Sequence, residues 1–257
     1  MFSERLSIRV SHFLMPKDGA AAEECEDAVG LNVGGGRFAV ADGATEAFDA
    51  GRWARALAEG WAGGAPRSAA EFRAWVAGEG ERLHEAWAGR ELPWYAEEKA
   101  RGGSFAAFVG LSIEAEGGAL RWRAIALGDA CLVRRRDGVI RAAMPLGRAE
   151  DFNSCPALVP SRAAALDAAL AQAVTAEGAA EAGDTFLLLS DAAAAWFLKL
   201  SEGRSPAVGE FDSRLAASDN EALAALFRRE RAAGRIKDDD VAVVRVAIQE
   251  VDGSAPH

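Results

Sequence analysis

The sequence predicts a fold of the α+β class, because strand-like and helix-like segments come in separate runs along the chain. Alternating apolar and polar residues open the chain, helical spacing follows from about residue 46, strand patterns return from residue 103, and helices return before a last strand. Repeated strand–helix–strand units would alternate regularly instead. At 257 residues, without an internal repeat or a clear linker, the chain is expected to form a single domain over residues 1–257.

The first elements are expected to be antiparallel strands. Leu6, Ile8 and Val10 alternate with polar neighbours, as in a half-buried strand. Segments 28–33 and 37–41 flank three glycines, which predicts a hairpin. Because the two ends of a hairpin are adjacent in space, the aspartates that open and close it, at positions 27 and 42, should lie at one end of the sheet.

Two helices should follow this hairpin. Apolar residues recur at helical spacing between residues 53 and 61 and again between 72 and 87, with a Gly-Gly-Ala-Pro break between the two segments. Ser68 is the expected N-cap of the second helix. The tryptophans at helical spacing should pack these helices onto a sheet.

A second run of strands is predicted at 103–114, 120–127, 130–135 and 139–142, with Asp137-Gly138 as a tight turn. Residues 144–160 contain three prolines and are expected to form a loop. The alanine-rich tract 163–182 keeps apolar residues at helical intervals, so it is interpreted as helix or flap. Together these residues suggest a variable, flap-like segment around 144–182.

The remaining elements are a short apolar strand, two helices and a last strand. They are predicted at 185–189, 192–200, 221–233 and 241–248. The run Arg134–Arg136 is expected to solvate the end of a hairpin.

Composition excludes several classes of protein. The chain is 50% hydrophobic and 26% charged, as in ordinary globular proteins. A net charge of -10 argues against nucleic acid as a partner. Three cysteines, at 25, 131 and 155, show no metal-ligand spacing and indicate a reduced protein. Without a signal-like segment or an apolar run that could span a bilayer, we expect a cytoplasmic protein that does not contact a membrane.

Five acidic signatures stand at the edges of predicted strands. A single carboxylate at such a place is usually a turn former or a helix cap, but five in phase with five strand edges predict a cluster of carboxylates. They are Glu26-Asp27, Asp42-Gly43, Gly128-Asp129, Ser190-Asp191 and Asp238-Asp239-Asp240.

Such a cluster requires a cation, since burying several like charges costs several kcal/mol per ion. An all-oxygen set without cysteine or histidine favours Mg²⁺ or Mn²⁺ over Zn²⁺. Two such ions can activate a shared water for attack on phosphorus. The sequence therefore predicts metal-assisted hydrolysis of a phosphate ester.

The order of these pieces also resembles the PPM-type (class 2C) metal-dependent serine/threonine protein phosphatases. The resemblance runs from about residue 10 to residue 246. The pieces that match are Glu26-Asp27, Val40-Ala41-Asp42-Gly43, Gly103-Ser104, Ala126-Leu127-Gly128-Asp129, Gly183 to Asp191 and Asp239 to Val244.

The resemblance implies a sandwich of two antiparallel β-sheets with helices on both outer faces, in four αββα layers. It also implies two or three Mn²⁺ or Mg²⁺ ions at one end of the sandwich. The implied metal ligands and catalytic residues are Asp27, Asp42 as the bridging ligand, Asp191 and Asp239, with the Gly43 carbonyl as a further ligand, Glu26 holding metal-bound water, and Asp129 at an additional metal.

Three departures concern the substrate side of the resemblance. The arginine that the family usually places before the Glu-Asp pair is missing, and Lys17, a point charge without the arginine fork, is a weak phosphate-binding candidate. Ala44 and its neighbours replace a segment that in many members holds a histidine. Ala192 replaces the glycine of the Ser-Asp-Gly signature.

The implied function is hydrolysis of phosphoserine or phosphothreonine in proteins, with a phosphorylated protein as substrate and a cognate kinase as its counterpart in signalling. Two alternatives stay open. The departures favour a catalytically weak, phosphatase-like module that binds a partner, and the unfamiliar flap favours a two-metal phosphatase of a small phosphorylated metabolite. The sequence leaves the oligomeric state open.

Overall fold

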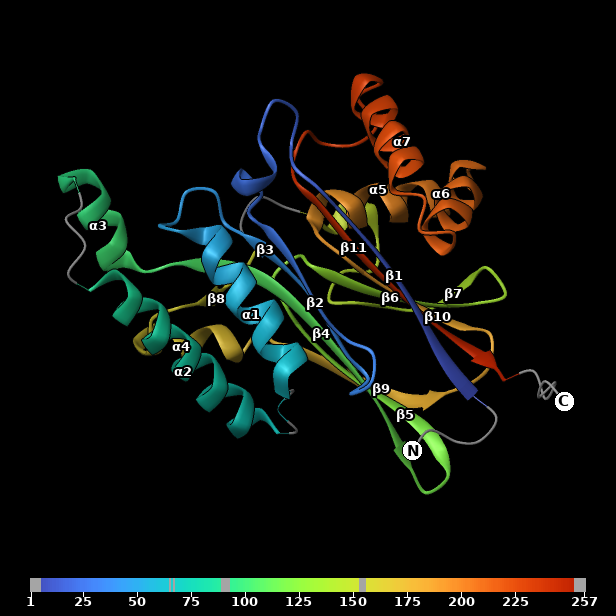
Figure 1. Cartoon of the computed structure of the whole chain (residues 1–257), viewed down its shortest axis with the longest axis horizontal. Coiled ribbons are helices and arrows are strands. Elements are labelled where there is room, and N and C mark those ends of the chain that lie inside the picture. Colours follow the sequence, from blue (N-terminus) through green and yellow to red (C-terminus); the bar gives the residue numbers. More distant parts are fainter. Residues whose placement is uncertain (1–5, 65, 67, 89–92, 153–155, 252–257) are drawn as a thin grey trace, which may run out of the picture.

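A sandwich of two antiparallel sheets forms the centre of the computed structural model (Figure 1). The structure describes residues 6–64, 66, 68–88, 93–152 and 156–251. The first sheet has the strand order β1-β11-β10-β6-β7, and the second has the order β2-β3-β4-β5-β9, with β8 paired to β4. Helices cover both outer faces, which confirms the predicted α+β sandwich with four αββα layers.

The strands of each sheet come from distant parts of the sequence. The first sheet contains β1 (Leu6–Met15), β6 (Cys131–Arg136), β7 (Val139–Met144), β10 (Asp184–Leu189) and β11 (Val241–Glu250). The second contains β2 (Asp27–Asn32), β3 (Arg37–Gly43), β4 (Phe105–Glu116), β5 (Ala119–Leu127), β8 (Val159–Pro160) and β9 (Val174–Ala180).

The helices form two separate outer layers. Those that follow the early strands are α1 (Ala50–Gly64), α2 (Ala69–Trp87) and α3 (Trp94–Gly102), with α4 (Ala163–Leu170) beside them. The layer on the first sheet contains α5 (Asp191–Glu202), α6 (Ala207–Ala216) and α7 (Asn220–Ala232). Short 3₁₀ turns occur at η1 (Ala22–Glu24) and η2 (Ala149–Asp151).

Apolar side chains fill all three spaces between the four layers. Phe38, Val109 and Leu188 belong to the core between the sheets, and all three are fully buried. Trp53 packs in the layer beneath α1 and α2, and Phe227 packs in the layer beneath α5 to α7. Alternating side chains of a central strand therefore point into two different cores, as Leu187 and Leu188 of β10 do.

The predicted hairpin has the expected register. β2 and β3 pair so that Asp27 lies opposite Asp42. Ser68 caps α2 as predicted, because its hydroxyl accepts a hydrogen bond from the Glu71 backbone N–H at 3.2 Å. These local signals were therefore sufficient for the hairpin and for the start of α2.

Close packing of α1 on the second sheet depends on a glycine in β2. A Cβ atom at Gly30 would lie 1.8 Å from the backbone oxygen of Ala58 in α1. Real Cβ contacts are far longer than this, so only glycine lets the helix approach the strand so closely. The helix that follows the Asp42 strand is thereby fixed against the sheet.

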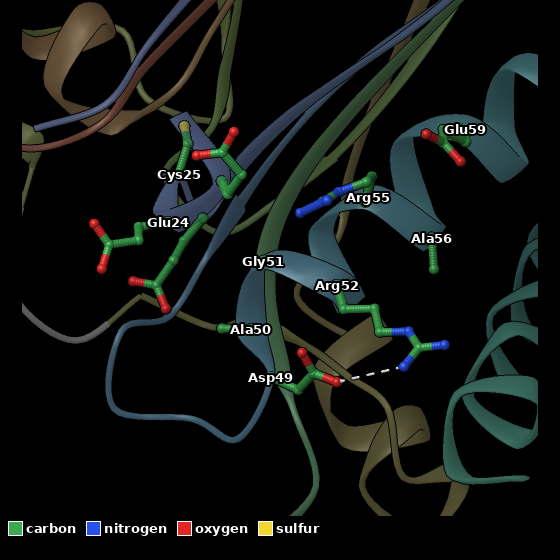
Figure 2. A pocket seen from close by; sticks show the side chains of 11 residues that line it. Glu24, Cys25, Asp49, Ala50, Gly51, Arg52, Arg55, Ala56 and Glu59 are labelled. Atoms are coloured by element: carbon green, nitrogen blue, oxygen red, sulfur yellow. Dashed lines mark ion pairs between the residues drawn. The ribbon is translucent and has the colours of Figure 1, made fainter. Parts of the chain in front are cut away.

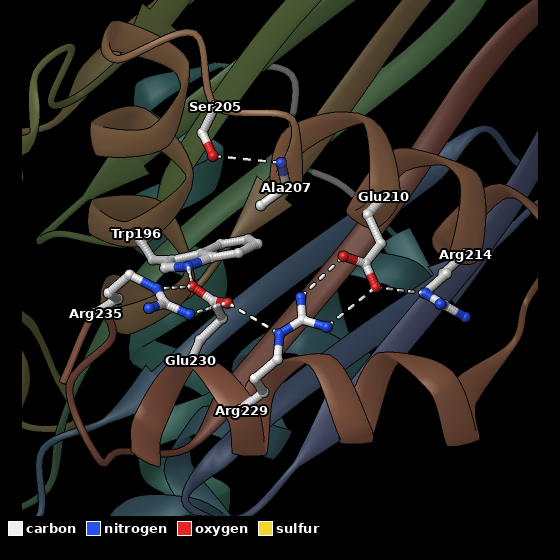
Figure 3. A network of polar contacts seen from close by, with 8 residues as sticks. All are labelled: Trp196, Ser205, Ala207, Glu210, Arg214, Arg229, Glu230 and Arg235. Carbon is white, nitrogen blue, oxygen red and sulfur yellow. Dashed lines mark hydrogen bonds and ion pairs between the residues drawn. The ribbon is translucent and has the colours of Figure 1, made fainter. Parts of the chain in front are cut away.

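A network of charged side chains joins the helices over the first sheet (Figure 3). The buried carboxylate of Glu230 in α7 accepts two hydrogen bonds from Arg235, both at 2.8 Å, and one from the Trp196 indole of α5 at 3.2 Å. Arg229 of α7 reaches Glu210 of α6 at 2.9 Å. The side-chain contacts hold the three helices together.

The sequence suggested that the arginine run in β6 solvates the end of a hairpin, and the structure shows that this prediction is wrong. Arg134 and Arg136 both bind the fully buried carboxylate of Asp184 in β10, with contacts of 2.8 and 2.9 Å. Arg135 pairs with Asp212 of α6 at 2.5 Å. The run instead connects β6 to its neighbours, because partners from other elements arrive on both faces of the strand.

Several elements were not predicted. The alanine-rich tract contains α4 but then forms strand β9, which pairs with β5 along the sheet edge. α3 and α6 lie in stretches without a predicted helix, and the expected loop 144–160 includes β8, which pairs with β4. Cys25 and Cys131 are free, buried thiols, and Cys155 lies outside the described residues. None of the helices in the described part of the chain has the length and apolar character needed to cross a membrane.

Candidate metal centre

The five acidic signatures come together at one end of the sandwich. Two of them belong to the second sheet, where β2 starts and β3 ends. Two others belong to the first sheet: Ser190-Asp191 lies where β10 passes into α5, and the triple aspartate lies just before β11. Gly128-Asp129 follows β5 of the second sheet. We call the resulting group the acidic rim; its members are Glu26, Asp27, Asp42, Asp129, Asp191 and Asp239.

Asp27 is the most deeply buried member of the acidic rim, and one of its carboxylate oxygens lacks a hydrogen-bond partner among the described residues. Its residue is 4% exposed, and its Oδ2 atom has no hydrogen-bond partner. Burial raises the pKa of Asp27 well above its usual range, a hydrogen bond with Ser190 opposes that shift, and the nearby carboxylates of Asp191 and Asp239 add to it. A charged Asp27 is therefore unfavourable here unless a cation is present.

The charged form of Asp42 is also unfavourable. Burial first, and then the carboxylates of Asp27, Asp191 and Asp129, raise the pKa of Asp42 well above its usual range. The backbone N–H of Asp191 lies 3.4 Å from Asp42 Oδ2. Among the described residues neither Asp27 nor Asp42 forms an ion pair, so no side-chain cation neutralises this inner pair of carboxylates.

Asp129 lies at the edge of the same electrostatic field. Burial, followed by the charge of Asp191, raises the pKa of Asp129 to about 6. Gly128 precedes it with a φ of 99°, and a Cβ there would lie 2.5 Å from the Cβ of Ala107. The glycine therefore allows the turn that brings Asp129 into the acidic rim.

Asp191 and Asp239 face the ammonium of Lys237. Lys237 Nζ lies 2.5 Å from Asp239 Oδ2 and 3.4 Å from Asp191 Oδ2. The sequence interpretation did not include Lys237. Its position two residues before Asp239, within an otherwise acidic run, was the signal that could have drawn attention to it.

Asp240 fixes the connection between β1 and β2 and has a different role from its neighbour Asp239. Its carboxylate accepts the backbone N–H of Lys17 at 2.8 Å and that of Glu26 at 2.7 Å. These contacts join residues more than 200 positions apart. Asp240 is thus a positioning residue that the sequence interpretation left without a role.

Glu26 and Gly43 complete the predicted set at the hairpin end. Lys17 Nζ lies 3.9 Å from Glu26 Oε2, so the weak phosphate-binding candidate is engaged by a member of the rim. The backbone N–H of Gly43 donates to the Glu26 carbonyl at 3.1 Å. A Cβ at Gly43 would lie 2.7 Å from the backbone of Ala50, so glycine is required where β3 meets α1.

Ala192 fits its position without strain. It lies inside α5, is buried, and does not belong to the non-glycine residues with positive φ in the described structure. The replacement of glycine by alanine in the Ser-Asp-Gly signature is therefore compatible with the local backbone. Asp191 occupies the first turn of the same helix, where the helix dipole favours a negative charge.

The rim fits hard divalent cations by its chemistry. Within the described residues no three acidic, histidine or cysteine side chains converge closely enough to form a ready ligand set. The donors are all oxygen atoms, however, and the orphaned Oδ2 of Asp27 together with the mutual repulsion of Asp27 and Asp42 calls for positive charge between them. These residues would therefore hold Mg²⁺ or Mn²⁺ rather than a softer ion.

A pocket of about 610 Å³ lies beside Glu26, between the residues before β2 and the start of α1 (Figure 2). Five carboxylates and two arginines belong to its lining. Arg52 pairs with Asp49 across 3.9 Å, as Figure 2 shows, and Arg55 belongs to the same helix. The excess of carboxylates makes this pocket a poor place for a phosphate group.

The sequence and the fold were compared with those of known proteins. No family model matches the sequence, and no curated protein matches it. In structure, the protein is similar to PppA, a key regulatory component of the T6SS in Pseudomonas aeruginosa, with a TM-score of 0.58 and 18% identity over 94% of this chain and 98% of that chain.

Two phosphatases of known structure are similar to this protein to a comparable degree. The catalytic domain of the serine/threonine phosphatase PstP, in complex with two manganese ions, has a TM-score of 0.57 and 17% identity over 95% of this chain and 99% of that one. The PPM phosphatase MsPP from Mycobacterium smegmatis, in complex with cacodylate, has a TM-score of 0.52 and 16% identity, covering 94% and 99%. At such low identity the likeness shows the fold, which is that of the PPM-type serine/threonine phosphatases, as the sequence resemblance implied.

Proposed function

We propose that the protein is a Mn²⁺- or Mg²⁺-dependent phosphatase that hydrolyses phosphoserine or phosphothreonine in proteins. One observation carries the proposal: carboxylates from both sheets gather at one end of a PPM-type fold, and the buried Asp27 and the half-buried Asp42 form no ion pair among the described residues. A fold that needed no cation would gain stability by replacing them with neutral side chains.

In this proposal Asp27, Asp42, Asp191 and Asp239 hold two or three ions, with help from the Gly43 carbonyl, Glu26 and Asp129. When bound, such ions supply Lewis acidity toward a phosphoryl oxygen and lower the pKa of water at the site. The manganese ions of PstP support the choice of metal.

The residues of the chain have their own parts to perform. Asp27 is buried and Asp42 is half-buried, so solvent screens their carboxylates only weakly and their charge would attract the ions strongly. Asp240 holds the backbone of Lys17 and Glu26, and thereby fixes the loop that borders the rim. The helix N-terminus at Asp191 orients that carboxylate.

We place the substrate among phosphorylated proteins, with a cognate kinase and a cytoplasmic signalling role. The serine/threonine phosphatases of the same fold and the regulatory role stated for PppA support this class of substrate. One observation favours the second candidate, a phosphatase-like module that binds a partner with little turnover: Lys237 engages two of the expected metal ligands.

The proposal is tested by hydrolysis of an aryl phosphate and of a phosphothreonine peptide, each with Mn²⁺ and with a chelator. We expect turnover that requires the metal and that Asp42→Asn reduces at least about a hundredfold, as for other losses of a charge-stabilising group. Mn²⁺ should also raise the melting temperature, and Asp42→Asn should abolish that shift. Absence of metal-dependent turnover on both compounds would refute the proposal.

Asp137→Asn is the matched control. Asp137 stands in the β6–β7 turn with a φ of 53°, a conformation that asparagine also adopts, and it is not part of the acidic rim. Its turnover and its response to Mn²⁺ should equal those of the wild type. Hydrolysis of the aryl phosphate but of no phosphopeptide would instead point to a small phosphorylated metabolite.

A further inference from the structure

The cations around the acidic rim differ in their freedom to bind a ligand. The side chain of Arg231 is 2% exposed and donates to the Pro16 carbonyl and to Asp18. Arg235 donates two hydrogen bonds of 2.8 Å to Glu230. Both guanidinium groups are therefore fixed by contacts within the protein.

Lys237 differs from these arginines in where it lies and in what it contacts. It belongs to the connection between α7 and β11, and its side chain is 65% exposed. Its ammonium contacts are carboxylate oxygens of two predicted metal ligands, Asp191 and Asp239. An exposed ammonium on a flexible stem can leave such contacts without disturbing the packed core.

A pocket of about 430 Å³ opens beside this ammonium. Asp129 and Asp191 of the acidic rim belong to its lining, together with Lys199 and Lys237. Phe152 and other apolar side chains form part of its wall. A volume of this size is ordinary for a ligand site, and the combination of cations with an apolar wall suits a phosphorylated side chain.

We propose that Lys237 is a positioning cation with two alternative partners, the carboxylates of Asp191 and Asp239 without metal and the substrate phosphate with metal. This inference rests on the proposed function for its second state. Divalent ions held by Asp191 and Asp239 would neutralise the charge that attracts the ammonium, and Lys237 would then be free to bind a phosphate dianion in the pocket.

Two affinities should respond in opposite directions when the ammonium is removed. In Lys237→Met the internal competitor for Asp191 and Asp239 is lost, so Mn²⁺ should bind roughly threefold to tenfold more tightly. Inorganic phosphate should bind the Mn²⁺-loaded variant about tenfold more weakly, because a charge-assisted contact is lost. A residue with a purely structural role would not shift the two affinities in opposite directions.

Calorimetric titration of the full chain measures both affinities without turnover. Lys237→Arg should bind phosphate about as tightly as the wild type, because it keeps the charge. In Lys237→Met, the KM for the aryl phosphate should rise by a larger factor than kcat falls. Lys99→Met, at an exposed lysine of α3 that lies 3.8 Å from Glu46, is the control and should behave as the wild type. Melting curves of each variant show that it is folded.

The outcomes separate this inference from the proposed function. If the wild type binds Mn²⁺ but Lys237→Met leaves Mn²⁺ or phosphate affinity unchanged, the role of Lys237 is refuted and the phosphatase proposal stands. If both affinities shift as expected but no compound is hydrolysed, Lys237 keeps its role and the phosphatase proposal fails. If the wild type binds no Mn²⁺, both are overturned.

Discussion

Replacing Asp27 by asparagine should stabilise the metal-free protein and weaken its response to Mn²⁺. The Asp27 carboxylate is buried, its Oδ2 atom lacks a hydrogen-bond partner, and the nearby carboxylates of Asp191 and Asp240 repel it. A buried polar atom without a partner costs about 1–3 kcal/mol. An amide of the same shape removes the charge and offers an N–H donor to its acidic neighbours.

The expected magnitudes follow from these terms. The free energy of unfolding of metal-free Asp27→Asn should exceed that of the wild type by about 1–3 kcal/mol, which corresponds to roughly 2–12 °C in melting temperature for a chain of this size. For the wild type, Mn²⁺ at about 100 times its Kd should add about 2.7 kcal/mol. If the variant binds tenfold more weakly, the same concentration adds only about 1.4 kcal/mol.

Thermal and urea unfolding with a chelator and with Mn²⁺ measure these changes, and Asp137→Asn again serves as the control. The two melting curves of the variant should therefore lie closer together than those of the wild type, with the metal-free curve moved to higher temperature. A metal-free variant that is less stable than the metal-free wild type would refute the argument, because Asp27 would then contribute stability through contacts that an amide cannot replace.

Two further predictions concern the helices. Hydrogen bonds from Arg235 lower the pKa of Glu230 to about 2, so Glu230→Gln should cost about 2–3 kcal/mol at pH 7 in urea unfolding. A carboxyl group whose pKa is lowered in the folded protein stabilises it at pH values above the pKa of the unfolded chain. The difference in unfolding free energy should therefore disappear as the pH falls from about 4 to 2. A difference that persists in full at pH 2 would contradict this assignment. Gly30→Ala should lower stability by about 3 kcal/mol or more by forcing α1 from β2, and circular dichroism melts would detect it; an unchanged melting temperature would show that the helix moves freely.

Local patterns in the sequence were sufficient for the hairpin and for the positions of the acidic signatures. Gly34 to Gly36 defined the turn, and period-two alternation then set Asp27 opposite Asp42. The strand β11 and the helix α2 were also evident, since long, regular apolar patterns leave few alternatives. Each of these features depends on residues close together in the chain.

Features that depend on distant partners were missed. β9 has the sequence VTAEGAA, which has little strand preference of its own, and it becomes a strand because the edge of β5 offers it hydrogen bonds. α6 contributes only Phe211 and Leu215 as buried residues, too few to show a helical period. The contacts of Lys237 likewise depend on how the connection before β11 folds across the rim.

The sequence separation of the contacts made by Asp240 has a consequence for biosynthesis. Its carboxylate meets backbone groups 223 and 214 residues earlier in the chain, and β11 lies between β1 and β10 in the first sheet. While the ribosome is still translating the helices before β11, the nascent chain therefore has no means of closing this end of the sandwich. The acidic rim is complete only after the segment before β11 has emerged, so a translation product truncated before Asp239 would lack part of the rim.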